Sequence, residues 1–248
     1  MLNSVILFTF LFGLPLSAAA RDFDRATDSL CFQNADPEMG QAAPFPWGKF
    51  AVKTGACQGI AGLAAAFFEN AEFNTEAAKP ASRAEVRALI LRIIHAHRLG
   101  WRPAAHKTEI PGYANLQRFC EDYRTEFLRS AVLYNRNIAT HEILKRLPEF
   151  IFSRGKIRSR PAAEQVLGTL DGFERKLQRG ELPLLLYYSH VVLVYSLKRS
   201  PLAIVLTVYD SNRKEQREIT FALDSAGLLD RRNPQNFMIW DITPERSF

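Results

Sequence analysis

The stretch GACQGIAGLAAAFFE, residues 55 to 69, decides the predicted fold: a glycine, a lone cysteine, then small and apolar residues at helical spacing. We expect a helix that begins at Cys57 and ends near Asn74. Unpaired N–H groups and the helix dipole favour an anion at this end, so a thiol there tends toward thiolate. Alternatively, Cys57 is a small core residue, because free cysteines are commonly buried. Two downstream residues, His190 and Asp210, favour the reactive interpretation.

The first 20 residues, MLNSVILFTFLFGLPLSAAA, predict a signal peptide. They carry no charged side chain and end in three alanines before Arg21 turns the chain polar. An uncleaved anchor is the alternative, but Gly13 and Pro15 interrupt a segment shorter than the roughly 20 apolar residues that a span needs. We therefore expect cleavage after Ala20, no membrane span in the mature chain, and a secreted or periplasmic protein.

Charge and histidine spacing argue against nucleic-acid and metal binding. The formal net charge of +6 is spread along the chain, and one small basic cluster, Arg154 to Arg160, has apolar neighbours and predicts a solvated loop. His95 and His97, two residues apart on an expected helix, point about 200° apart and cannot share an ion. We expect no nucleic-acid partner, no metal and no cofactor.

The three cysteines allow one disulfide and one leftover thiol in a chain that is expected to leave the cytoplasm. If Cys57 is chemically active, the pair left is Cys31 with Cys120. Two buried free thiols serve equally well, because sequence does not show whether the two Cα atoms lie within bridging distance.

Helical patterns come first along the chain and strand patterns second. Residues 21–46 predict an irregular lead-in, and Ser82 with Glu85 predicts a capping box. Helices followed by an antiparallel sheet define the α+β class. We expect one domain over 47–248, with a helical part at about 47–178 and a sheet part at about 179–248. The expected helices are 57–74, 82–99, 113–145 and 161–177, with a loop at 101–111. The expected strands are ELPLLLYYS, HVVLVYSL, LAIVLTVYD, EITFAL and NFMIWDI.

His190 and Asp210 are predicted to meet at one edge of this sheet. His190 opens one strand and Asp210 closes the next, across a short hairpin, so the start of one strand lies beside the end of its antiparallel neighbour. A carboxylate in this position can select the histidine tautomer and hold the ring toward a nucleophile.

These residues and spacings resemble the papain-like cysteine peptidases, in their bacterial Cys-His-Asp branch. In that family a histidine borne by a sheet follows the helix-starting cysteine by roughly 130 to 150 residues. Here His190 follows Cys57 by 133 residues, and Asp210 follows His190 by 20. GACQGIAG is similar to the bacterial Gly-x-Cys-x-Gly-x-Ala string, and HVVLVYSL and VYDSN are similar to His-Ala-Val-x-x-Tyr and Val-Tyr-Asp-Pro-Asn. The resemblance covers about Trp47 to the C-terminus and implies a papain-like fold, with the cysteine helix packed against the sheet.

The resemblance also implies a function, that of a cysteine protease or related thiol hydrolase acting on peptide or protein substrates. Cys57 attacks a carbonyl to form a thioester, His190 shares and then relays its proton, and Asp210 orients His190. Asn212 is the alternative orienting group, since the papain branch proper uses Asn. Asp210 is preferred because VYD matches at the strand end.

Three positions depart from the family pattern. Ala51 stands where an oxyanion-hole glutamine is expected, Ser211 replaces the proline after the acid, and Val191 replaces the small residue after the histidine. Loss of one oxyanion-hole donor typically costs about 10² to 10³ in rate. The backbone N–H of Cys57 can supply half of the hole. Polar candidates for the other half are Gln41, Lys53 and Thr54.

Three alternative functions follow from these departures and from the residues. Ala51 favours a papain-like module that has lost catalysis and binds a peptide or partner protein. A deamidase or acyltransferase can use the same triad, because an acyl-enzyme reacts with amines as well as with water. A structural envelope protein with Cys57 in its core is the third. A strongly lowered thiol pKa favours an enzyme, whereas an inaccessible Cys57 favours the structural protein.

Overall fold

The computed structural model describes residues 22–34, 36–42, 56–98, 107–134, 163–187, 190–213, 215–224 and 239–241. The expected signal segment, the basic cluster at 154–160 and the positions Ala51, Lys53 and Thr54 lie outside these ranges. The chain combines helices with an antiparallel sheet, so the predicted α+β class is confirmed. Within the same ranges, no helix is both long enough and apolar enough to cross a membrane.

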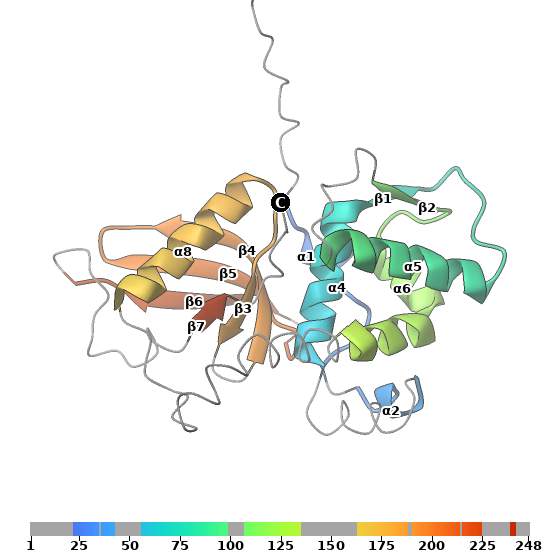
Figure 1. Ribbon diagram of the computed structural model, residues 1–248, viewed down its shortest axis with the longest axis horizontal. Coiled ribbons are helices and arrows are strands. Elements are labelled where there is room, and N and C mark those ends of the chain that lie inside the picture. The colour runs from blue at the N-terminus through green and yellow to red at the C-terminus, as the bar shows by residue number, and fades with distance from the viewer. Residues whose placement is uncertain are drawn as a thin grey trace, which may run out of the picture.

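Helix α4 (Cys57–Asn70) stands at the centre of the fold, with the sheet on one side and helices α5 (Arg83–Arg98) and α6 (Leu116–Asp122) on the other (Figure 1). Every residue from Gly59 to Phe68 is buried, because the helix is covered on both sides and its small side chains allow close packing. The helix ends four residues before the predicted end. Ala71–Asn74 forms strand β1, which pairs in parallel with strand β2 (Thr108–Pro111), inside the predicted loop.

The remaining helical part follows local capping signals. Helix α5 (Arg83–Arg98) begins as predicted: Ser82 Oγ accepts from the Glu85 N–H at 3.2 Å, and Glu85 Oε2 accepts from the Ala81 N–H at 2.8 Å. The predicted helix 113–145 is divided. Helix α6 (Leu116–Asp122) has Asn115 as its N-cap and Tyr123 as its C-cap, and a second helical stretch covers 124–134. The rest of the predicted helix lies outside the described residues.

All five predicted strands form, and within the described residues they make one antiparallel sheet. Both sheet faces are covered: α4 packs on one, and helix α8 (Ala163–Gln178) covers the other (Figure 1). Double burial explains why the runs at 184–187, 191–194 and 203–209 are almost continuously apolar, whereas 217–222, at the edge of the sheet, alternates buried with exposed residues. Helix α8 therefore packs with the sheet, although it precedes the sheet part in sequence. The strand order is β6 (Arg217–Ala222), β5 (Ala203–Tyr209), β4 (His190–Arg199), β3 (Leu184–Tyr187) and β7 (Ile239–Asp241).

The lead-in contains two single-turn helices, α1 (Arg25–Asp28) and α2 (Met39–Ala42), within irregular chain. A disulfide joins Cys31 in the lead-in to Cys120 in α6, with the two Cα atoms 5.7 Å apart. Of the chain's three cysteines, all of them described, Cys57 keeps its thiol. The pairing of Cys31 with Cys120, which the sequence predicted if Cys57 is chemically active, is therefore the one that forms.

Close packing around α4 gives a stability prediction. A Cβ added at Gly62 lies 2.8 Å from Cζ of the Tyr134 ring, which is buried and hydrogen-bonded to His97. We expect Gly62→Ala to lower the free energy of unfolding by about 1–3 kcal/mol, because the ring has to move in a filled core. Thermal or urea unfolding followed by circular dichroism measures the change.

The matched control is Gly168→Ala on α8. No atom lies within 4 Å of a Cβ placed there, so the same chemical change creates no clash. An alanine inside a helix is favoured over glycine by up to about 1 kcal/mol, and this variant is expected to be neutral or more stable. Equal destabilisation by the two variants would contradict the packing account of Gly62.

Candidate active site

The fold brings the three predicted site residues to one end of α4. Cys57 is the first residue of α4, His190 is the first residue of β4, and Asp210 directly follows the last residue of β5. Strands β4 and β5 are antiparallel, with Leu193 opposite Tyr209. Antiparallel pairing places the start of β4 beside the end of β5, as the sequence predicts.

Asp210 is a buried carboxylate with three donors around it. His190 Nε2 lies 2.6 Å from Oδ1, the backbone N–H of Asn212 donates to Oδ1 at 2.9 Å, and Arg217 Nη1 donates to Oδ2 at 2.6 Å. Burial alone raises the pKa of Asp210, but these hydrogen bonds outweigh it and hold the pKa well below the ordinary 3.8. Asp210 is therefore ionised at neutral pH and fixes the orientation of the His190 ring.

Arg217 is a site residue that the sequence reasoning missed. It is the first residue of β6, opposite Val208 in the sheet register, and its guanidinium also lies 5.5 Å from the centroid of the Tyr187 ring. A signal was present, because a basic residue at the start of the next strand faces an acid at the end of the previous one. Its position shows that the charge of Asp210 is shared between a histidine and an arginine.

Cys57 is only partly exposed, and its sulfur accepts a hydrogen bond from the Val191 N–H at 3.4 Å. Burial raises the pKa of the thiol. The hydrogen bond with His190, the Val191 N–H, the charge of His190 and the Gln58 N–H outweigh burial and lower it from the ordinary value of 9.0. The departure at Val191 does not affect this contact, since a backbone N–H supplies it and the side chain is buried in the core.

His190 is the cationic partner of the thiol. Burial lowers its pKa, but hydrogen bonds with Asp210 and Cys57, together with the charges of both, raise it from 6.5 to about 9. Because Nε2 faces Asp210, Nδ1 is the nitrogen left for the sulfur. The lowered pKa of Cys57 and the raised pKa of His190 both favour a thiolate and an imidazolium in series with the carboxylate of Asp210, which is the arrangement of an activated nucleophile.

Asn212, the alternative orienting residue, also lies beside the histidine. Its Nδ2 is 3.4 Å from Nδ1 and 3.4 Å from Nε2 of His190, so it points directly at neither nitrogen. The short, directed contact to the ring is the one from Asp210, at 2.6 Å. The geometry therefore favours Asp210 as the orienting group.

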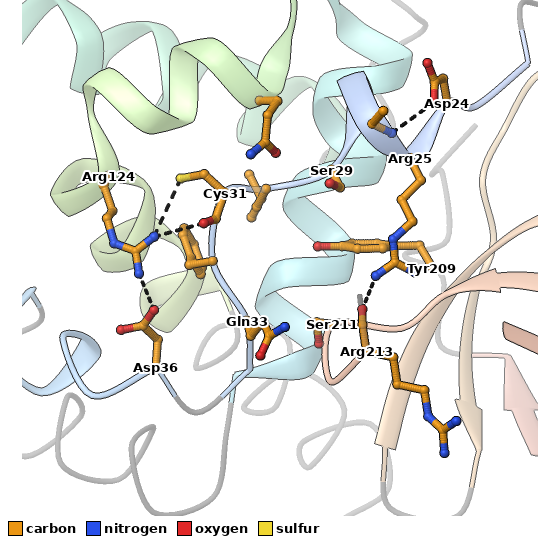
Figure 2. Close-up of a pocket in the computed structure, with 14 residues that line it drawn as sticks. Asp24, Arg25, Ser29, Cys31, Gln33, Asp36, Arg124, Tyr209, Ser211 and Arg213 are labelled. Carbon is orange, nitrogen blue, oxygen red and sulfur yellow. Dashed lines mark hydrogen bonds and ion pairs between the residues drawn. The ribbon is translucent and has the colours of Figure 1, made fainter. Parts of the chain in front are cut away.

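A cavity of about 750 Å³ lies near the loop that follows Asp210, and neither Cys57 nor His190 lines it. Figure 2 shows it between the lead-in chain and the end of β5, with Ser211 on its wall. Ser211 Oγ is buried and has no hydrogen-bond partner within the described residues. Gln41, the one described side-chain candidate for the second half of the oxyanion hole, lies on α2.

Among the described residues, no group of three or more His, Cys, Asp and Glu side chains is arranged to hold a metal ion. Comparisons with protein-family models, with curated proteins and with solved structures find no match to this chain. A functional conclusion therefore depends on the geometry and electrostatics of the site itself.

The paired pKa shifts predict a bell-shaped pH dependence for a reaction at Cys57. The thiolate forms above the lowered pKa of Cys57, and the imidazolium persists below the pKa of His190 at about 9. Turnover should fall as pH rises through about 9. The raised pKa of His190 also contributes to the stability of the folded protein. This contribution is fully present below pH 6.5 and is lost as the pH rises through about 9.

The pH dependence of iodoacetamide alkylation measures the thiol pKa directly, without a substrate. His190→Ala should return the alkylation profile toward that of an ordinary cysteine, because the imidazolium no longer stabilises the thiolate. A wild-type thiol that titrates at or above 9.0 would contradict the thiolate–imidazolium pair.

Proposed function

We propose that this protein is a thiol hydrolase with a papain-like architecture that cleaves peptide or amide bonds in peptides or proteins. The observation that carries the proposal is the continuous chain from the Cys57 sulfur through His190 to Asp210, with the pKa of Cys57 lowered and the pKa of His190 raised. A central helix between a helical part and an antiparallel sheet supports the architecture. Partial exposure of Cys57 argues against a purely structural role.

Catalysis would proceed in two steps. The Cys57 thiolate attacks the substrate carbonyl carbon, and the developing oxyanion lies near the N-terminal end of α4, where backbone N–H groups and the helix dipole favour negative charge. His190 gives its proton to the leaving amine, and a thioester forms. His190 then takes a proton from water as that water attacks the thioester, releasing the acid and restoring the thiolate.

The Cys31–Cys120 disulfide supports the proposed location outside the cytoplasm. Disulfides form and persist in oxidising compartments and are rare in the cytosol. The expected signal segment gives the same location from an independent part of the chain. A secreted or periplasmic protein is therefore the proposed setting for this activity.

Incubating the protein with a mixture of denatured proteins as substrates distinguishes a peptidase from a deamidase. After incubation, mass spectrometry identifies new peptide amino termini and conversions of glutamine to glutamate. A peptidase produces new termini that are absent when Cys57→Ala replaces the wild type. A deamidase produces the conversions without new termini. Neither change, together with a thiol of ordinary pKa, would contradict the proposal and favour a peptide-binding module.

A further inference from the structure

The lead-in residues 31–34 and 36–38, called the strap below, contact both sides of the site through Asn34. The backbone N–H of Ala56 donates to Asn34 Oδ1 at 2.5 Å, and the backbone N–H of Asn34 donates to the Ser211 carbonyl at 3.0 Å. Ala56 directly precedes Cys57, and Ser211 directly follows the acid. One residue of the strap therefore links the helix that carries the nucleophile to the loop that carries the acid.

The N-cap residue of α4 provides no capping side chain. Ala56 occupies the N-cap position, and its side chain accepts no hydrogen bond. Asn34 instead binds the Ala56 N–H from 22 residues away, which fixes the chain just before Cys57. The contact matters because Cys57 lies on the central helix while His190 and its acid lie on the sheet, so their separation depends on how these two elements are held together.

The strap is itself held firmly on the helical side. The disulfide joins Cys31 to Cys120, and Arg124 Nη1 donates to the Cys31 carbonyl at 2.9 Å. The same guanidinium forms ion pairs with Asp36 and with Glu38, the latter at 2.9 Å. Figure 2 shows Arg124 between Cys31 and Asp36. Asn34 is thus held in place by the disulfide at Cys31 before it in the chain and by the ion pairs of Asp36 and Glu38 after it.

A second tie lies on the sheet side. Arg25 of α1 donates to the carbonyls of Arg213 and Glu215, in the turn between Asp210 and β6. Its guanidinium also lies 5.4 Å from the centroid of the Tyr209 ring. The lead-in therefore binds the turn that carries the acid at two places, through Arg25 and through Asn34.

We propose that Asn34 is a positioning residue that sets the separation between Cys57 and the His190–Asp210 pair. It contacts no reacting atom and acts through Ala56 and Ser211. For turnover, this inference rests on the proposed thiol hydrolase function. For the reactivity of the Cys57 thiol it does not, because alkylation needs no substrate.

The test compares Asn34→Ala with wild type, both with the disulfide intact. The variant loses the side-chain contact to Ala56 and keeps the backbone contact to Ser211. We expect alkylation by iodoacetamide at about pH 6 to slow about tenfold, because a displaced sulfur pairs less well with the imidazolium. On a peptide substrate we expect kcat to fall about 10- to 100-fold, with KM changed less than about twofold.

Two further variants make the result specific. Asn34→Asp keeps an oxygen that accepts from Ala56 and should recover kcat to within about threefold of wild type. Gln33→Ala removes the exposed neighbouring side chain on the same strap and should leave both readouts unchanged. If Asn34→Ala does not fold, Asn34→Gln moves the amide by one methylene and should show the same losses.

Unchanged alkylation and kcat in Asn34→Ala would overturn the positioning role. A lower melting temperature with an unchanged alkylation profile would also overturn it, because that result assigns Asn34 to stability alone. If the wild type hydrolyses no substrate, the proposed function fails, and the alkylation profiles still decide the role of Asn34.

Discussion

Cys57→Ala is expected to lower kcat by about 10⁵- to 10⁶-fold, the loss seen when the nucleophile of a catalytic triad is removed. The sulfur supplies the bond-forming electron pair, and no other thiol is present because Cys31 and Cys120 are joined. Hydrolysis of a peptide identified in the mixture assay measures the effect. Stoichiometric labelling by a thiol-directed epoxysuccinyl inhibitor should disappear with it.

Folding of the Cys57→Ala variant is the control. The side chain is partly exposed and the surrounding helix is rich in alanine, so the melting temperature should stay close to that of wild type. Hydrolysis that survives in a folded Cys57→Ala variant would exclude covalent catalysis by this residue.

Asp210→Asn is expected to give the second largest effect, a fall in kcat of about 10⁴-fold. The carboxylate accepts from His190 Nε2 at 2.6 Å and stabilises the imidazolium, and an amide of the same shape cannot carry this charge. The pKa of His190 should fall from about 9 toward 6.5, and the pKa of Cys57 should rise. Kinetics on the same peptide and the alkylation profile measure both changes.

Asp210→Asn also removes the ionic partner of Arg217, whose Nη1 lies 2.6 Å from Oδ2. We expect the free energy of unfolding to fall by about 1–3 kcal/mol, because a partly buried guanidinium loses its charged acceptor. Asn212→Ala is the matched control. It leaves the backbone hydrogen bond to the acid in place and should change kcat less than about threefold. A large loss in Asn212→Ala with a small loss in Asp210→Asn would make Asn212 the orienting residue.

Local patterns predicted most elements of this fold. The five strands are apolar runs bounded by turn residues, and α5 begins at a capping box, so their signals lie within a few residues of one another. One error comes from an element that depends on a distant partner. Strand β1 is four residues long and is formed by pairing with β2, more than thirty residues away in the chain.

The sequence by itself determined the α+β class, the five strands of the sheet, and the meeting of Cys57, His190 and Asp210 at the end of α4. A cysteine at a helix start, with a histidine and an acid at facing ends of antiparallel strands, is a local pattern joined by simple pairing rules. Only the tertiary structure decided that Cys31 bonds to Cys120, that Arg217 shares the charge of Asp210, and that Asn34 holds the start of α4. The physical reason is that most of these contacts join segments far apart in the chain, and their distances depend on how whole elements pack.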